Sequence, residues 1–169
     1  QILLFFSKQI KEFYSNFEIF NLFKSNKRLL LFLFEENILK PTEEIYYIIN
    51  DDKYKKRFYL QYFYIEFRNI VSERERLKIK KEIPNDNDFE LFKKMRKTGE
   101  NETYICNLIR NDSVIDFIAF INKKNISLTT TIEPTIFETN NYLLKNKPSL
   151  IEYAAFFGSI RIFNYLYQN

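Results

Sequence analysis

The sequence predicts an all-α protein, on the strength of three observations. The 169 residues include only two glycines, which leaves little material for the tight turns of β-hairpins. Apolar residues recur at spacings of three and four, which is the period of a helix with one buried face. Ser72 stands three positions before Glu75, and Ser149 three before Glu152, a spacing that is typical of helix N-termini.

Residues 1–98 are predicted to form a helical N-terminal region. Pro41 suits the first position of a helix, and Glu43 and Glu44 follow in the first turn, where the helix dipole favours carboxylates. Gly99 is expected to end the last helix of this region. The expected helices cover Leu3–Phe17, a segment from Ile19, Leu29–Phe34, a segment from Pro41, about Tyr54–Ile70, Ser72 to about Lys81 and a segment from Phe89, with a loop over Pro84–Asp88.

Residues 99–169 are predicted to contain paired short helices. Asn101 and Thr103 are both candidate caps of the first helix of 101–122, and Ser113 is the candidate cap of the second, with a turn at Asn111–Asp112 between them. The Thr-rich, β-branched residues 125–133 favour a loop or a short extended piece. The remaining expected elements are a helix from Pro134 to about Leu144, one that Ser149 opens and Gly158 ends, and a last one that Ser159 opens.

The two helix pairs are copies of one pattern. Segment 103–121 aligns with 149–167, so that Asp112 falls on Gly158 and Ser113 on Ser159. Helix pairs that recur predict stacked units of an α-solenoid. The positions expected to be largely buried are Ile105, Leu108, Ile109, Phe117, Ala154, Ala155, Ile162, Phe163 and Leu166, and exposure of Ala155 would speak against the register of the alignment.

The second copy, 149–168, resembles an ankyrin repeat. Ser149 takes the position of the usual Thr, Ala154 and Ala155 take the alanine pair, and Gly158 takes the glycine of the tight turn. Leu150 and Glu152 depart from the Pro and His of that pattern, and the first copy, 103–122, lacks both alanines and the glycine. The copies lie 46 residues apart, whereas ankyrin units repeat at about 33, so an insertion at about 122–146 is expected.

Longer runs are similar to a large protist family of ankyrin-repeat proteins, in which a helical domain of unknown function precedes the repeats. These runs are FKSNKRLLLFLFEENILKPT, YICNLIRNDS, IFETNNYLL and SLIEYAAFFGSI. The resemblance implies a non-enzymatic scaffold that binds a protein partner, with Phe156, Phe157 and Glu152 as candidate partner-binding residues. A second apolar surface is expected along the last helix, at Ile160, Phe163 and Tyr167, and because the ends of a solenoid need polar caps, further repeats are expected beyond Asn169.

A basic, aromatic stretch keeps a second function open. Residues 53–97 hold 14 Lys/Arg and 7 Asp/Glu, a net charge of +7, and KYKKRFYLQYFY at 53–64 interleaves cations with aromatic rings. Nucleic-acid surfaces use this combination, so Lys55, Lys56 and Arg57 are candidate polyanion-binding residues. An amphipathic helix with a solvated lysine face accounts for the same pattern.

The sequence lacks the motifs of several classes of catalytic and ligand-binding sites. The chain has no His, which excludes His-based triads and metal sites, and no glycine-rich phosphate loop. The single Cys106 lies among apolar residues, which favours a structural thiol over a nucleophile and a reducing, cytoplasmic setting. No apolar run is long enough to span a bilayer. We therefore expect no catalytic residue, cofactor or metal site, and place an enzyme third.

Overall fold

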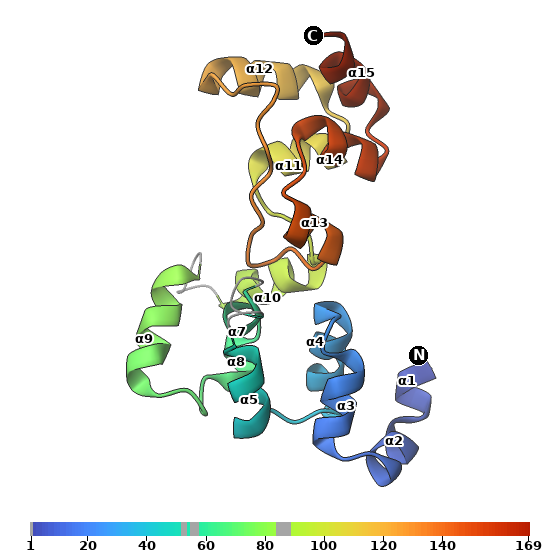
Figure 1. Ribbon diagram of the computed structural model, residues 1–169, viewed down its shortest axis with the longest axis vertical. Coiled ribbons are helices and arrows are strands. Elements are labelled where there is room, and N and C mark those ends of the chain that lie inside the picture. Colours follow the sequence, from blue (N-terminus) through green and yellow to red (C-terminus); the bar gives the residue numbers. More distant parts are fainter. Residues whose placement is uncertain (1, 52–53, 55–57, 84–88) are drawn as a thin grey trace. The chain divides into compact units, whose positions relative to one another are not determined.

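The structure, a computed structural model, describes residues 2–51, 54, 58–83 and 89–169. Every regular element in these ranges is a helix, which confirms the all-α prediction (Figure 1). The β-type pairing found there is an isolated antiparallel bridge between Thr131 and Ser149. None of the helices in the described ranges combines the length and the apolar character needed to cross a membrane. The chain divides into two compact units, Gln1–Gly99 and Glu100–Asn169, which are described in turn.

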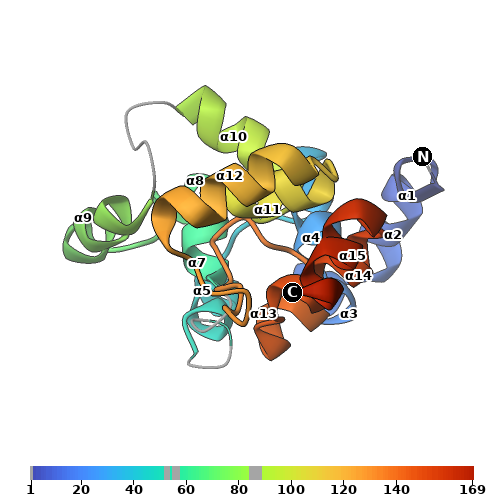
Figure 2. The same ribbon diagram turned by 90° about the horizontal axis from the view of Figure 1, so that it is seen from above.

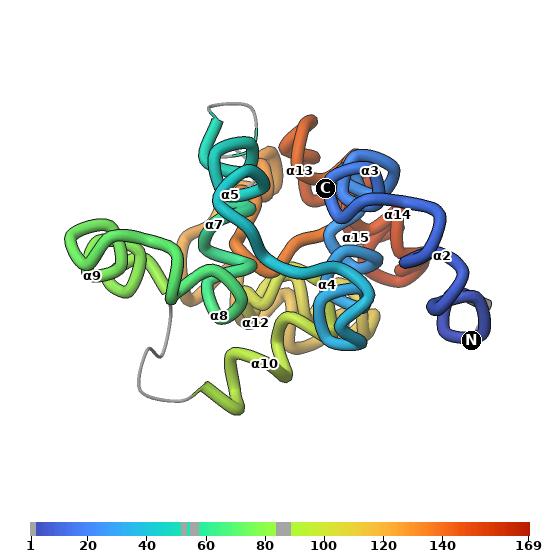
Figure 3. Tube along the Cα trace, turned by 90° about the horizontal axis from the view of Figure 1, so that it is seen from below, coloured from blue at the N-terminus to red at the C-terminus, as the bar shows by residue number. Residues whose placement is uncertain are grey.

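The first unit is built from short helices, most of which begin where the sequence indicates. Ser72 caps α9 by accepting a hydrogen bond from the Glu75 amide, as the spacing predicts, and Gly99 ends α10 with a φ of 69°. In Figure 3, α3 and α4 lie side by side and are in contact. The helices are α1 (Ile2–Phe5), α2 (Ser7–Phe13), α3 (Asn16–Phe23), α4 (Lys27–Glu35), α5 (Glu43–Ile49), α7 (Tyr59–Tyr62), α8 (Tyr64–Phe67), α9 (Glu73–Glu82) and α10 (Phe89–Thr98).

Three predicted helices of this unit were wrong in detail. The helix expected over Leu3–Phe17 is two helices, α1 and α2, which are separated at Phe6, and Phe17 belongs to α3. Helix α5 begins at Glu43 rather than Pro41, because the Thr42 hydroxyl accepts from the Ile45 amide and acts as the cap. The single helix expected over 54–70 is broken, since Phe58 adopts a left-handed conformation with a φ of 56° immediately before α7. The loop predicted at Pro84–Asp88 lies outside the described residues.

A buried arginine ties α10 to α7 and α8. Arg96 is 2% exposed, and its guanidinium donates to both carboxylate oxygens of Glu66, at 2.7 and 3.0 Å. It also donates to the Tyr62 carbonyl at 2.9 Å, while the Tyr62 hydroxyl donates to the Arg96 carbonyl at 2.9 Å. Removing one member of such a buried, paired network leaves the others desolvated, which is costly. This network therefore fixes the packing of the first unit.

The second unit consists of two helix pairs and a connector. The first pair is α11 (Tyr104–Arg110) with α12 (Val114–Lys124), and the second is α14 (Leu150–Phe157) with α15 (Ile160–Gln168). Figure 2 shows α11 beside α12 and α14 beside α15, and α11 also packs on α14 and α12 on α15. The connector carries α13 (Asn141–Asn146), and its bridge from Thr131 to Ser149 joins it to the start of the second pair.

The capping of this unit differs from the prediction at three places. Of the two candidate caps of α11, Thr103 stands at the N-cap position but makes no side-chain capping hydrogen bond, and the Asn101 side chain accepts from the Thr103 amide and hydroxyl. Ser113 stands at the N-cap of α12, but its side chain makes no capping hydrogen bond. The helix expected from Pro134 begins only after Asn140, whose side chain accepts from the amides of the first turn.

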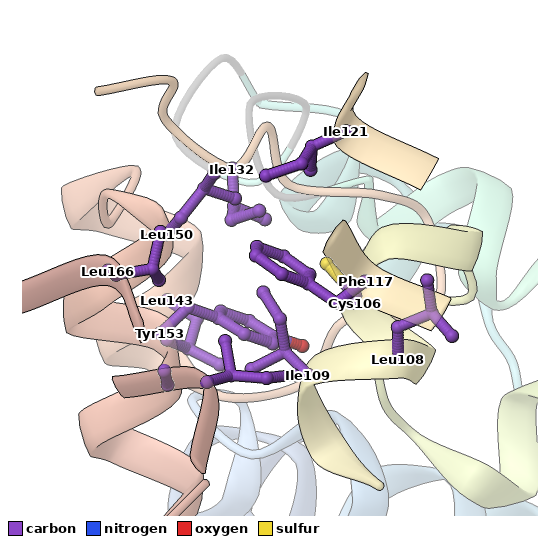
Figure 4. Close-up of a cluster of buried hydrophobic side chains, with 12 residues drawn as sticks. Cys106, Leu108, Ile109, Phe117, Ile121, Ile132, Leu143, Leu150, Tyr153 and Leu166 are labelled. Atoms are coloured by element: carbon purple, nitrogen blue, oxygen red, sulfur yellow. The ribbon is translucent and has the colours of Figure 1, made fainter. Parts of the chain in front are cut away.

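Side chains from both pairs converge on one apolar cluster, with Phe117 near its centre (Figure 4). Most of the positions expected to be buried are buried, and two of them, Ile105 and Phe163, are only partly covered. Ala155 is exposed, so that expectation was wrong. Successive helical residues are turned by about 100°, so Ala154 faces the cluster while Ala155 lies on an uncovered side. The buried positions are Leu108, Ile109, Phe117, Ala154, Ile162 and Leu166.

Replacing Gly158 tests the turn between α14 and α15. Gly158 has a φ of 70°, and nothing lies within 4 Å of where a β-carbon would stand, so backbone strain alone sets the cost of a side chain. We expect Gly158→Val to lower the free energy of unfolding in urea by about 1–3 kcal/mol. Gly158→Asn is the control and should cost less, because Asn tolerates the left-handed region. Equal losses for both variants would contradict the argument from strain.

Candidate interaction surface

Helix α14 begins with a complete capping box. The Ser149 hydroxyl accepts from the Glu152 amide, and Glu152 Oε2 accepts from the Ser149 amide and hydroxyl, both at 2.8 Å. The hydrogen bond from the Ser149 backbone, followed by that from its hydroxyl, lowers the pKa of the exposed Glu152 carboxyl. The carboxylate of Glu152, a predicted partner-binding residue, is therefore already engaged in hydrogen bonds at the N-terminus of its own helix.

The two helix pairs have the same layout at an offset of 46 residues. Their first helices begin at Tyr104 and Leu150, and their second helices at Val114 and Ile160. The residue that turns the chain has positive φ in both copies, 49° at Asp112 and 70° at Gly158. The two pairs thus match each other in helix starts and turns, but the exposure of Ala155 counts against the register in which the second pair was aligned with the ankyrin pattern.

A carboxylate of the first pair caps a helix of the second. Asp112 Oδ1 accepts from the Ile162 amide at 2.9 Å, and Oδ2 accepts from the Arg161 amide at 3.0 Å. These amides belong to the first turn of α15, where a helix has no acceptors of its own. Beside them, the buried Ser159 hydroxyl donates to the Ile109 carbonyl at 2.5 Å. Together these bonds form a polar joint that fixes how the second pair stacks on the first.

A second polar link runs through the interior of the stack. The Arg110 guanidinium donates to the Tyr153 hydroxyl at 3.0 Å and pairs with Glu100 at 2.9 Å. Burial raises the pKa of the Tyr153 hydroxyl and of the Cys106 thiol. Both groups are therefore neutral near pH 7, and the thiol is a core group rather than an exposed nucleophile.

Phe156 and Phe157, the predicted binding residues, have different surroundings. Phe157 is half-buried, with its ring 4.8 Å from that of Tyr153 and the Arg110 guanidinium 5.9 Å away. Phe156 is 43% exposed, and it stacks on Tyr142 of α13 with ring centroids 6.0 Å apart and 2° between the ring planes. Tyr142 and Phe156 are called the aromatic pair below. The connector thus covers Phe156 only in part, and Tyr142 is a surface aromatic residue that the sequence analysis did not single out.

The last helix exposes a second apolar surface. Tyr167 is 77% exposed and stacks on the half-buried Phe163, with ring centroids 6.3 Å apart and 6° between the planes. Ile160 is 68% exposed on the same side of α15, and Ala155 is exposed at the end of α14. These four residues, Ala155, Ile160, Phe163 and Tyr167, are called the outer face below.

The candidate residues of the basic site that the sequence left open, Lys55, Lys56 and Arg57, are not among those that the structure describes. The neighbouring tyrosines are buried, since Tyr54, Tyr59 and Tyr62 are 6%, 1% and 0% exposed. The hydroxyls of Tyr59 and Tyr62 donate to backbone carbonyls of the same unit. In this conformation the three rings are core aromatics and offer no surface for base stacking.

Comparisons with protein-family models, curated proteins and solved structures found no match to this chain. Among the described residues, no group of three or more Cys, Asp or Glu side chains could hold a metal ion. The aromatic pair and the outer face are accordingly the features of the second unit from which a function can be argued.

Removing the carboxylate of Asp112 tests the joint between the pairs. We expect Asp112→Gly to lower the free energy of unfolding by about 1–2 kcal/mol, because Gly accepts the positive φ but leaves two amides of α15 without their acceptor. Asp112→Asn is the matched control, since Asn keeps an oxygen acceptor and tolerates the same φ, and it should lose less. Urea unfolding measures both, and a larger loss for Asn than for Gly would show that the carboxylate does not act as a cap.

The capping box makes a pH-dependent contribution. Because the pKa of Glu152 is lowered in the folded chain, its carboxylate stabilises the fold at neutral pH, and this contribution is lost as the pH falls through the lowered pKa. We expect Glu152→Gln to lower the thermal midpoint at pH 7, with a difference from the parent that vanishes in acid. Exposed Glu12, changed to Gln, is the control and should show no such convergence. A difference that stays constant with pH would rule out the charged cap.

Proposed function

We propose that this chain is a non-enzymatic protein-interaction scaffold whose second unit is an ankyrin-like solenoid. The observation that carries the proposal is the stacking of α14 and α15 on α11 and α12, two pairs of equal layout joined through Asp112 and Ser159. We also propose membership of the protist ankyrin-repeat family that the sequence resembles. The capping box at Ser149 and the positive φ of Gly158 support it.

The aromatic pair is the proposed contact for the partner. Phe156 and Tyr142 remain 43% and 50% exposed although they stack on each other. Aromatic side chains are enriched at the energetic centres of protein interfaces, because they bury a large area with few rotatable bonds. The half-buried Phe157 ring contacts the Phe156 ring at 5.0 Å, and the Arg110 guanidinium lies 5.9 Å from the Phe157 ring. These contacts support the position of Phe156. A partner that covers the pair would therefore meet a preorganised surface.

The nucleic-acid alternative has less support. It rests on the net charge of residues 53–97, because the tyrosines that could have stacked on bases are buried. Helix α9, within this segment, also interleaves its Lys and Arg with Glu73, Glu75 and Glu82. A mixed surface of this kind gives little of the counterion release that drives binding to polyanions.

Photocrosslinking at position 156 tests the proposed function. We expect benzoylphenylalanine in place of Phe156 to crosslink a specific protein in extracts of the source cells, and Tyr142→Glu in the same chain to abolish that crosslink. The matched control places the photoreactive residue at Ile115, which is 76% exposed on α12 outside the aromatic pair. The proposal fails if the two positions crosslink the same proteins, or if the chain instead binds a polyanion column in a salt-dependent way.

A further inference from the structure

The first two helices of the first unit expose most of their apolar side chains. Helix α2 buries none of its residues, whereas α3, α4 and α5 each bury two or more. Phe5 of α1 is 78% exposed, and Phe13 of α2 is 74% exposed. Residues 2–14 are called the N-terminal arm below, and they lie at one edge of the unit in Figure 1 and Figure 3. The large apolar side chains that the arm exposes are Leu4, Phe5, Phe6, Phe13 and Tyr14.

Helix α2 separates its apolar side chains from its charged ones. Successive residues turn by about 100° around a helix, so Phe6, Ile10 and Phe13 fall within about 60° of one another. Phe6 belongs to this set because its carbonyl accepts from the Ile10 amide at 2.8 Å and so continues the turn of α2. Lys8 and Lys11 fall on the other side of the helix, and both are exposed. A Phe-rich face opposite lysines is typical of helices that lie in the surface of a bilayer.

The charge of the first unit is complementary to an anionic surface. The unit holds 20 Lys/Arg and 15 Asp/Glu, a net charge of +5, whereas Glu100–Asn169 holds 6 and 7, a net charge of −1. The charged residues of the arm itself are Lys8, Lys11 and Glu12. Basic residues beside an inserted apolar face add electrostatic attraction to anionic lipids. The apolar side chains and the charge therefore favour the same kind of surface.

Two other occupants fit the arm less well. A protein groove that receives a helix reads one continuous apolar stripe, but the arm is interrupted at Phe6, between α1 and α2. A second copy of the chain would bring two units of net charge +5 together, and like charges oppose that contact. A lipid surface requires neither a continuous stripe nor a fixed register, because hydrophobic burial is non-directional.

We propose that the N-terminal arm binds the surface of a bilayer that contains anionic phospholipid. The Phe5 and Phe6 rings contact each other with centroids 5.0 Å apart, so the two helices present one apolar group. These rings and Phe13 enter the boundary between headgroups and acyl chains, while Lys8 and Lys11 stay among the headgroup phosphates. The arm is too short to cross a bilayer and lies on it. This inference goes beyond the proposed function and concerns the unit that does not carry the aromatic pair.

Vesicle binding by the 169-residue chain tests the proposal. Co-sedimentation is measured with vesicles of phosphatidylcholine alone and with vesicles of phosphatidylcholine mixed with phosphatidylserine. We expect the chain to bind the mixed vesicles about tenfold more strongly, and added salt to weaken that binding. The chain contains no Trp, so Phe5→Trp supplies a single fluorophore. Its emission should shift to shorter wavelength when the vesicles are added.

Paired glutamate substitutions test the apolar face. Phe5→Glu with Phe13→Glu should lower the binding to mixed vesicles about tenfold or more, since two apolar side chains no longer enter the bilayer. The thermal midpoint should stay unchanged, because both positions are exposed. The matched control is Ile115→Glu with Tyr167→Glu, which adds the same charge at equally exposed apolar positions of the second unit and should leave the binding intact.

Paired glutamine substitutions test the charge. Lys8→Gln with Lys11→Gln should weaken binding to the mixed vesicles, whereas Lys123→Gln with Lys124→Gln, which removes the same charge from exposed positions of α12, should not. The proposal is overturned if the chain binds neither kind of vesicle or both equally well, or if either control pair weakens binding as much as its counterpart. It is also overturned if the fluorophore at position 5 shifts with rising protein concentration alone, since a second copy would then be the occupant.

Discussion

The carboxylate of Asp112 is the interaction on which the second unit depends. It stands at a turn with positive φ, a conformation that costs free energy for any residue but glycine and is least unfavourable for Asn and Asp. That cost is offset because the turn holds both carboxylate oxygens against the first amides of α15. Turn geometry, helix capping and the stacking of the pairs therefore rest on one side chain. The apolar cluster around Phe117 buries most of the surface between the helix pairs, but hydrophobic burial is non-directional. The hydrogen bonds of the polar joint determine the register in which the second pair packs on the first.

The first unit has a comparable anchor of different chemistry. Arg96 is almost completely buried, yet its charge is matched by Glu66 and by the Tyr62 carbonyl. Desolvation offsets much of the attraction within a buried ion pair of this kind, whereas removing one partner alone leaves an uncompensated buried charge and is strongly destabilising. The ion pair holds short helices together where their own length gives them little intrinsic stability.

Local signals in the sequence predicted most of the helices, but some of what was missed is local as well, since the caps at Thr42 and Asn140 bond amides within three residues. The capping box at Ser149, the cap at Ser72 and the turns at Gly99 and Gly158 follow from hydrogen bonds within a few residues. The break at Phe58 could not be predicted in this way, because nothing in a phenylalanine indicates a left-handed conformation.

The candidate site shows the same division between local and long-range signals. Phe156 could be found from its place in the repeat pattern, whereas Tyr142 could not, since it reaches Phe156 only through the fold of the connector. Asp112 was recognised as a turn residue, but its role as a cap joins segments about 50 residues apart and leaves no local pattern. Burial of Ala155 was inferred from the repeat alone, which says which side of a helix is apolar but not whether anything covers it.

The bridge between Thr131 and Ser149 has a consequence for how this chain can vary. The Ile132 amide donates to the Pro148 carbonyl and the Leu150 amide to the Thr130 carbonyl, so the two ends of segment 133–147 are clamped together. Between these ends lie α13 and buried residues such as Phe137, but residues added at an exposed position of the segment would only lengthen a closed loop, which costs about 0.6 kcal/mol for each doubling of its length. The number of residues separating the two pairs is therefore uncoupled from their mutual geometry, and a spacing of 46 can leave the same stack as a shorter one.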